Sequence, residues 1–406
     1  MKLRLVCLFL LLSFPSFAQL NNAVFIDTIP NQTSNKNNIF FGFESFNFLK
    51  NNEYADGIAN GYTLFGYQIT PSFAYQPSEK VSLQAGAFFW KDFGNDNFTQ
   101  IAPTFSVKLK FDSLTIISGN LQGNLSHNLI EPLFDFERVI NKRLEGGFQL
   151  IYHKPRFYAD LWIDWLKAIY PASNFQEEIS AGLSAHYNLI QTEKMLVRLP
   201  LQMQIFHRGG QIGSISKPNT NWLNLALGFS ISQQVRNRGF IRSFKVDNYV
   251  VLYNNFSEDF NNFKSSFVFS RGNGYYFNFL LNTKYVDVML SYWQGNQFRS
   301  LQGGKLFQSV NDIAVPRVGE PDTVTVVPPR PNLRGKPRPA DPPKPYNSEV
   351  DRELIIVRLI KDIRVLKNLY VTVRVEPVFN LGTGKFQFSQ GFYVNYRQRF
   401  LIKKLP

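Results

Sequence analysis

The sequence predicts an all-β fold, a transmembrane antiparallel β-barrel of about sixteen strands. Three observations point to it. Apolar and polar side chains alternate over many segments of strand length. After the first residues, no apolar run reaches the roughly 18–20 residues that a membrane-spanning helix needs. Aromatic residues make up 16% of the chain, an excess typical of a lipid-facing surface.

The segment from residue 195 to residue 205 shows the alternation. Its odd positions are Met, Val, Leu, Leu, Met and Ile, while Arg198, Gln202 and Gln204 stand among the even ones. A period of two predicts a strand with one dry face and one wet face. We therefore expect Leu199 to face lipid, where an arginine would destabilise the barrel. Gln202 should face an aqueous lumen and tolerate an arginine.

The first residues predict that the chain is exported. A basic start at Lys2 and Arg4 precedes an apolar run over residues 5–12 and a small-x-small site that ends at Ala18. This pattern indicates a cleaved signal peptide over residues 1–18. The single cysteine lies inside it, so the mature chain has neither a disulfide nor a thiolate metal site.

The rest of the chain divides into a lead and a barrel. Residues 19–38 are polar and rich in Asn, and they predict a flexible periplasmic lead. Residues 39–406 form the predicted barrel. Its strands are expected at 39–50, 61–76, 81–91, 100–111, 114–125, 144–153, 156–166, 178–190, 194–206, 221–233, 243–254, 274–283, 284–294, 353–362, 368–379 and 385–400.

The expected connections alternate between tight and long. Residues 76–79, 112–113, 153–155, 191–193 and 282–284 are tight, and the connections between them are longer. This asymmetry is typical of barrels with periplasmic turns and extracellular loops. An even number of strands then leaves both ends of the barrel chain in the periplasm.

Among the connections, 126–143 and 295–350 are the most distinctive. In the first, Pro132 precedes apolar residues at near-helical spacing, which predicts either a short helix in the barrel mouth or an irregular surface loop. The second is a long Pro-rich loop, with prolines and basic residues concentrated at 316–345. That stretch is either a contact arm or an inert insertion.

The last strand carries a more specific pattern. Ser389, Gly391, Val394 and Tyr396 have the spacing of the segment that the barrel-assembly machinery reads, and Phe400 follows before a polar end. With its signal peptide and asymmetric connections, the chain resembles the porin-like outer-membrane β-barrels of Gram-negative bacteria, in the style of Bacteroidota. The resemblance implies an outer-membrane location, with membrane lipid, lipopolysaccharide and the barrel-assembly machinery as partners.

Catalytic chemistry has weak support in the residues. Of the four histidines, His127 and His207 fall in or near outer loops and His153 at a tight turn. His186 lies on an inner strand face between Ser184 and Asn188. This set could resemble that of a membrane phospholipase, but the surrounding motifs are missing, so a polar lumen residue is the preferred interpretation. We expect no metal and no cofactor.

Charged side chains on the inner faces are the candidate functional residues, because charge facing lipid is costly. They are Lys108, Lys110, Arg156, Asp160, Asp164, Arg198, Arg358, Arg374, Glu376, Arg397 and Arg399. Either they line an open pore and select its solutes, or they pair and fill the lumen. The sequence favours the pore, since sixteen strands enclose more space than side chains fill.

These patterns predict a porin-like channel for passive or weakly selective diffusion of small polar or anionic solutes, and no enzyme activity. The alternative is an accessory barrel of an export complex that uses residues 316–345 as its contact arm. A lipid-modifying membrane enzyme is a third hypothesis. The net charge of +14 is spread along an exported chain, so nucleic acid is not an expected partner.

Overall fold

The structure, a computed structural model, describes residues 22–26, 29, 35–210, 212, 219–235, 239–257, 269–311 and 348–405. Over these residues the chain forms sixteen strands and a few very short helices. The strands are β1 (Asn38–Glu53), β2 (Tyr62–Gln76), β3 (Val81–Asp92), β4 (Gln100–Lys110), β5 (Leu114–Asn120), β6 (Gly146–His153), β7 (Phe157–Lys167), β8 (Glu177–Gln191), β9 (Met195–Gly209), β10 (Thr220–Gln234), β11 (Ile241–Asn255), β12 (Arg271–Thr283), β13 (Asp287–Asn296), β14 (Asp351–Leu366), β15 (Leu369–Asn380) and β16 (Phe386–Lys404). The helices are η1 (Ala23–Phe25), η3 (Asn124–His127), α1 (Arg138–Asn141) and η5 (Lys305–Phe307).

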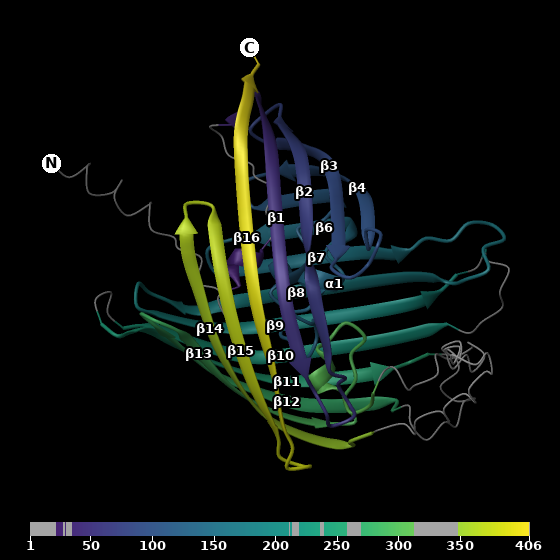
Figure 1. The fold of residues 1–406 in the computed structure, drawn as a ribbon, viewed down its shortest axis with the longest axis vertical. Coiled ribbons are helices and arrows are strands. Elements are labelled where there is room, and N and C mark those ends of the chain that lie inside the picture. Colours follow the sequence, from purple (N-terminus) through teal and green to yellow (C-terminus); the bar gives the residue numbers. More distant parts are fainter. Residues whose placement is uncertain are drawn as a thin grey trace, which may run out of the picture.

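The strands close into one antiparallel barrel. Each strand pairs with the next along the chain, and β1 pairs with β16 to complete the ring. Figure 1 shows β16 in yellow beside β1 in purple. Closure leaves no edge strand, so each strand pairs on both sides, as a sheet in hydrocarbon requires.

The alternation of side chains decides which face of each strand is outside. Leu199 on β9 is 43% exposed and Phe73 on β2 is 57% exposed, whereas Gln202 on β9 is 3% exposed. Apolar side chains thus cover the outer wall, and most polar side chains point inward. A closed barrel with such a surface is an outer-membrane barrel, as the sequence predicts.

Among the described residues, no helix has the length and apolarity to cross a membrane.

The connections differ at the two ends of the barrel. Residues 77–80, 111–113 and 154–156 are tight and lie at the end where β1 begins, which we call the turn end. The connection 121–145 and the described residues 297–311 and 348–350 of the connection between β13 and β14 lie at the opposite end, which we call the loop end. By this asymmetry the loop end faces the cell exterior.

The connection 121–145, between β5 and β6, folds into the barrel. Leu133 and Ile140 have no exposed surface. Gln68 on β2 donates a hydrogen bond to the carbonyl of Ile140 at 2.6 Å. On the other side, Gln202 on β9 donates to a carbonyl of this connection at 3.0 Å. The connection therefore spans the lumen from one wall to another.

The segment 297–311 also lies inside the barrel. Phe298 and Phe307 pack edge-on against Trp293 of β13, with ring centroids 5.0 and 5.4 Å apart. Asn224 on β10 donates to the carbonyl of Arg299 at 2.6 Å. Together with the connection 121–145, this segment fills much of the lumen toward the loop end.

Several expectations need correction at their boundaries. The strand predicted over 114–125 ends at Asn120, because the chain turns inward and Leu121 donates its amide to Glu145. The strand predicted from residue 284 begins at Asp287. The helix expected in 126–143 is the short α1, and it lies inside the barrel.

The described part of the expected lead 19–38 also lies within the barrel. Phe25 is 2% exposed and Ile29 is 8% exposed, and both pack against residues of the lumen. The predicted signal peptide and the Pro-rich stretch 316–345 lie outside the described residues.

Candidate functional site

A polar cavity lies at the loop end, between the barrel wall and the inward segments. We call it the loop-end cavity. Its wall comes from β1, β2, β14 and β15, and its other side from the connection 121–145 and η5. The ionisable and phenolic side chains that line it are Lys50, Tyr54, Tyr62, Glu131, Asp135, Glu137, Lys305, Arg358 and Glu376. So many groups of both signs in one cavity are typical of a site that binds or transforms a polar ligand.

Glu137 is held rigidly at one side of this cavity. Asn52 on β1 donates to one carboxylate oxygen at 2.7 Å. The Tyr62 hydroxyl bonds to the other oxygen, and the Lys50 ammonium lies 3.6 Å from the first. All three partners come from inward-facing positions of β1 and β2 or from the end of β2. These contacts fix the orientation of the Glu137 carboxylate.

Asp135 lies two residues earlier and has a different environment. Its amide donates to the carbonyl of Gln302 at 2.7 Å, and its carboxylate accepts the amide of Glu137 at 3.0 Å. Burial, and then the neighbouring negative charge of Glu137, raise the pKa of Asp135 to about 7. A buried carboxyl that changes its protonation near neutral pH is suited to acid–base chemistry.

Buried arginines form the floor of the cavity. Arg358 pairs with Glu131, and its Nε lies 3.8 Å from Glu376. Arg374 pairs with Glu376 at 2.7 Å and lies over the ring of Phe136, 3.7 Å from its centroid. These contacts join β14 and β15 to the connection 121–145, so the charges of the floor are fixed before any ligand enters.

The cavity reaches the surface beside the outer wall. Asn60, Tyr62 and Lys305 line it and are exposed at the loop end. Three residues beyond Tyr62 on β2, Phe65 points outward, is 50% exposed and packs on Phe93 at 4.6 Å. The opening is therefore close to the lipid-facing surface.

A second cluster of charged groups, around His127, anchors the connection 121–145. The imidazole is stacked on Trp162 of β7 at 3.6 Å, and its nitrogens lie 2.8 Å from Asp160 and 2.8 Å from Glu145. Gly182 on β8 makes room for the indole, since a Cβ there would lie 2.1 Å from it. With both nitrogens engaged by carboxylates, His127 is a structural cation and not a free base.

Burial opposes the charge of His127, but Asp160 and Glu145 outweigh it and raise the pKa of the imidazole to about 9. His127 was expected in an outer loop, yet it lies inside the barrel with no exposed surface.

The structure separates the charged residues proposed from sequence into three groups. Arg358 and Glu376 line the loop-end cavity, and Arg374 pairs with Glu376. Asp160 bonds to His127 of the connection 121–145, and Asp164 accepts the amide of Gly146 at the start of β6. Lys108, Arg198, Arg397 and Arg399 lie toward the turn end, while Lys110 and Arg156 are exposed there. The strongest pairing among them is at the loop end.

The other proposed residues lie on β8 and β16. The ring of His186 stacks on Tyr158, with centroids 5.2 Å apart. His186 shares the inward face of β8 with Ser184 and Asn188. A phospholipase of the kind considered above would need this histidine on the outer wall. On β16, Ser389 and Gly391 face inward, whereas Val394, Tyr396 and Phe400 face outward.

Asp135 and Glu137 were not proposed as functional residues from sequence. Their connection was singled out for its apolar spacing, and the two carboxylates within it were the missed signal. Acidic residues in an otherwise apolar segment must face something polar, and here they face Lys50, Asn52 and Tyr62.

Within the described ranges, no group of three or more His, Cys, Asp and Glu side chains has the arrangement of a metal site.

Solved structures with a similar fold include outer-membrane proteins. OccAB4 of Acinetobacter baumannii is 10% identical, covering 92% of this chain and 100% of that one, with a TM-score of 0.44. A loop-deletion mutant of OmpT of Vibrio cholerae is 10% identical, covering 89% and 99%, with a TM-score of 0.48. OprD of Pseudomonas aeruginosa is 10% identical, covering 90% and 94%, with a TM-score of 0.43. A comparison with curated proteins finds no match.

A family model matches most of the sequence. It is described as "Lipid A 3'-O-deacylase-type" and aligns with residues 31–327 and 340–405. This match contradicts the expectation that the chain is not an enzyme, because the family is described by an enzymatic activity. The sequence argument had looked only for a nucleophile–histidine set with its surrounding motifs.

Proposed function

This chain belongs to the lipid A 3'-O-deacylase-type family, and on that premise we propose that it hydrolyses an ester-linked acyl chain of an outer-leaflet glycolipid in the loop-end cavity. The observation that carries the proposal is the pairing of Asp135, with a pKa near 7, and the fixed carboxylate of Glu137 beside basic side chains. Lipopolysaccharide is the corresponding partner class.

Each group has a role in this mechanism. Deprotonated Asp135 takes a proton from water as the water oxygen attacks the ester carbonyl. The negative charge that forms on the carbonyl oxygen is stabilised by Lys50 and Arg358, which the surrounding carboxylates hold in place. When the tetrahedral intermediate collapses, the ester C–O bond breaks, and the leaving alkoxide receives the proton from Asp135. The products are a free fatty acid and an alcohol.

The position of the cavity supports a lipid substrate. Its opening at Asn60, Tyr62 and Lys305 is next to outward aromatic side chains, where the outer leaflet meets the headgroup layer. A lipid can present its polar part to the cavity while its remaining chains stay in the membrane.

The Asp135→Asn variant tests the assignment. The purified barrel in detergent is incubated with glycolipid from the outer membrane, and released fatty acid is measured by mass spectrometry. Hydrolysis by the native protein should rise with pH through about 7, because Asp135 must lose its proton to act. The variant should lose at least about a hundredfold in rate, the scale of general-base catalysis.

Asp112→Asn is the matched control, since Asp112 is exposed in a tight connection at the turn end. It should leave the rate unchanged. Full hydrolysis by Asp135→Asn would show that another group is the base, and no hydrolysis by the native protein would overturn the proposed function.

A diffusion channel is a second proposal. The observation that favours it is a row of short polar side chains on the inner faces of β2, β3 and β4, including Thr70, Gln84, Thr104 and Ser106, which line an inner cavity. Steady single-channel conductance in planar bilayers, with a preference for anions, would support it. The accessory role depended on residues 316–345, which lie outside the described residues, and no contact in the structure favours it.

A further inference from the structure

The N-terminal residues 22–26 and 29 lie against the inner wall of the barrel, and we call them the strap. Side chains of the wall capture its backbone carbonyls. Asn395 on β16 donates to Val24 at 2.7 Å, and Arg397, two residues further along the same face, donates to Ile26. Four strands further around the barrel, Lys108 on β4 donates to the carbonyl of Ile29 at 2.7 Å. The wall thus holds the strap through its main chain at several points, some of them with charged donors.

One side chain of the strap has a pocket of its own. The ring of Phe25 packs edge-on against Phe46, Phe136 and Tyr393, with centroids 5.9, 5.3 and 5.3 Å away. Such edge-on contacts add to the gain from burying the ring. Captured carbonyls and a fitted aromatic pocket are the elements of a peptide-binding groove.

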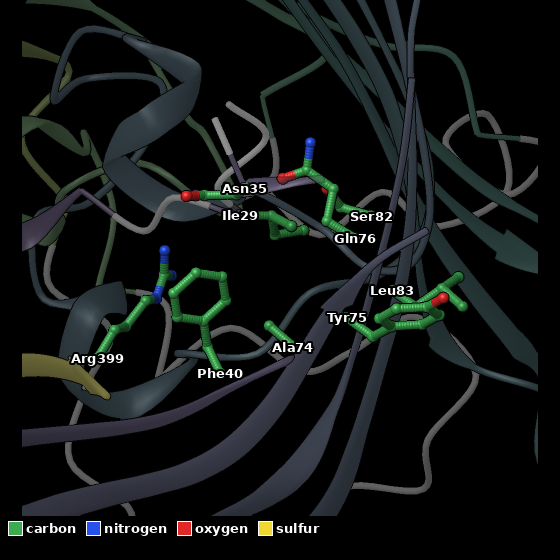
Figure 2. Close-up of a pocket in the computed structure, with 9 residues that line it drawn as sticks. All are labelled: Ile29, Asn35, Phe40, Ala74, Tyr75, Gln76, Ser82, Leu83 and Arg399. Atoms are coloured by element: carbon green, nitrogen blue, oxygen red, sulfur yellow. The ribbon is translucent and has the colours of Figure 1, made fainter. Parts of the chain in front are cut away.

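The end of the strap lines two cavities of the lumen. Figure 2 shows Ile29 near Gln76 in the cavity at the turn end, with Arg399 beside Phe40 at another part of the lining. Ile29 also lines the inner cavity, together with Glu44 and Thr70. The side chain of Ile29 thus lines both cavities, and it belongs to the same buried apolar cluster as Leu129 and Trp162.

We propose that the inner faces of β16, β1 and β4 form a peptide-binding groove, that the strap occupies it as a tethered ligand, and that the strap thereby closes the barrel from the turn end. Displacement of the strap joins the turn-end cavity to the inner cavity and admits ions. This binding function is separate from the proposed hydrolysis and does not depend on it.

The experiment uses the full-length barrel in planar bilayers. The native protein should conduct little. Phe25→Ala, which removes the side chain that fills the aromatic pocket, should show frequent openings. A synthetic peptide of residues 22–29 added to the turn-end side should restore the closed state. The same peptide with alanine in place of Phe25 should bind roughly ten- to a hundredfold more weakly, because it lacks the buried ring.

Phe41→Ala is the control, because Phe41 lies on the outward face of β1. It should conduct like the native protein. If Phe25→Ala does not fold, Asn395→Leu, which removes a carbonyl donor, is tested with the same peptides. The proposal fails if the folded variant stays closed, or if the native peptide neither binds nor closes the open variant.

Discussion

At the scale of single residues, β9 shows how neighbouring positions meet opposite surroundings. Leu199 is 43% exposed on the outer wall, whereas Gln202 is 3% exposed inside. The facing of both was predicted from the alternation alone. The surroundings of Gln202 could not be predicted, because the period of a strand says nothing about what occupies the lumen. Gln202 accepts the amide of Ile130 at 2.8 Å and donates to Asn128 at 3.0 Å.

These surroundings revise an expectation. Leu199→Arg should lower the free energy of unfolding by roughly 2–4 kcal/mol if the residue is near the bilayer midplane. Gln202→Arg, expected to be tolerated in an aqueous lumen, should instead detach the connection 121–145 while the barrel itself stays folded. Urea unfolding in lipid vesicles measures the first effect, and protease cleavage within 121–145 measures the second.

Leu199→Phe, which keeps an apolar side chain facing lipid, serves as the control and should unfold like the native protein. Equal stability of Leu199→Arg and the native barrel would mean that β9 does not face lipid there.

At the scale of elements, the connection 121–145 departs most from what the sequence could establish. Its apolar spacing left open a short helix in the mouth or an irregular surface loop, and the structure has the short helix α1. Its depth in the lumen depends on contacts with β2, β7 and β9, which are remote in sequence. The long-range ion pairs of His127 decide the position of this connection, and no local pattern encodes them.

The anchor at His127 should make this connection sensitive to alkali. Because the pKa of the folded-state imidazole is raised from 6.5 to about 9, its contribution to stability is fully present below about pH 6.5 and is lost as pH rises through about 9. The uncharged ring then leaves Asp160 and Glu145 without their shared cation. We expect a change in tryptophan fluorescence near pH 9, since Trp162 is stacked on the ring.

Asp160→Asn removes one of the two charges that raise this pKa, so it should move the transition to lower pH. Trp162→Phe should abolish most of the signal. A transition that stays in place in Asp160→Asn would exclude His127 as the titrating group.

At the scale of the whole molecule, the sixteen described strands enclose a lumen that protein segments largely fill toward the loop end. The strand number and the order of the elements followed from periodicity and turn residues. Whether the inner charges face water or pair with one another could not be predicted, because both arrangements need the same alternation. Arg352 illustrates the answer, since it pairs with Asp56 and Glu349 and donates to the carbonyl of Leu306 at 2.6 Å.

The filled lumen predicts the behaviour of the barrel as a channel. The double variant Gln204→Leu and Asn224→Leu removes the amides that bind the segment 297–311 at Gln302 and Arg299. Introduced into Phe25→Ala, whose strap is displaced, the double variant should conduct several-fold more than Phe25→Ala alone in planar bilayers, because the segment at the loop end is then also free to move. Gln294→Leu, at an outward position on β13, should have no effect.

An unchanged conductance of Phe25→Ala on addition of the double variant would mean that these amides do not hold the segment in place.

The location of the strap also constrains how the barrel is assembled. The ring closes where β1 meets β16, and Val24 and Ile26 are bound to the inner side of that seam. A closed wall leaves no lateral entry, so the N-terminal residues either enter along the lumen from the turn end or are in position as the final strands join. A bulky affinity tag fused directly ahead of Asn22 would have to be accommodated within the lumen, so reporter fusions belong at the opposite terminus.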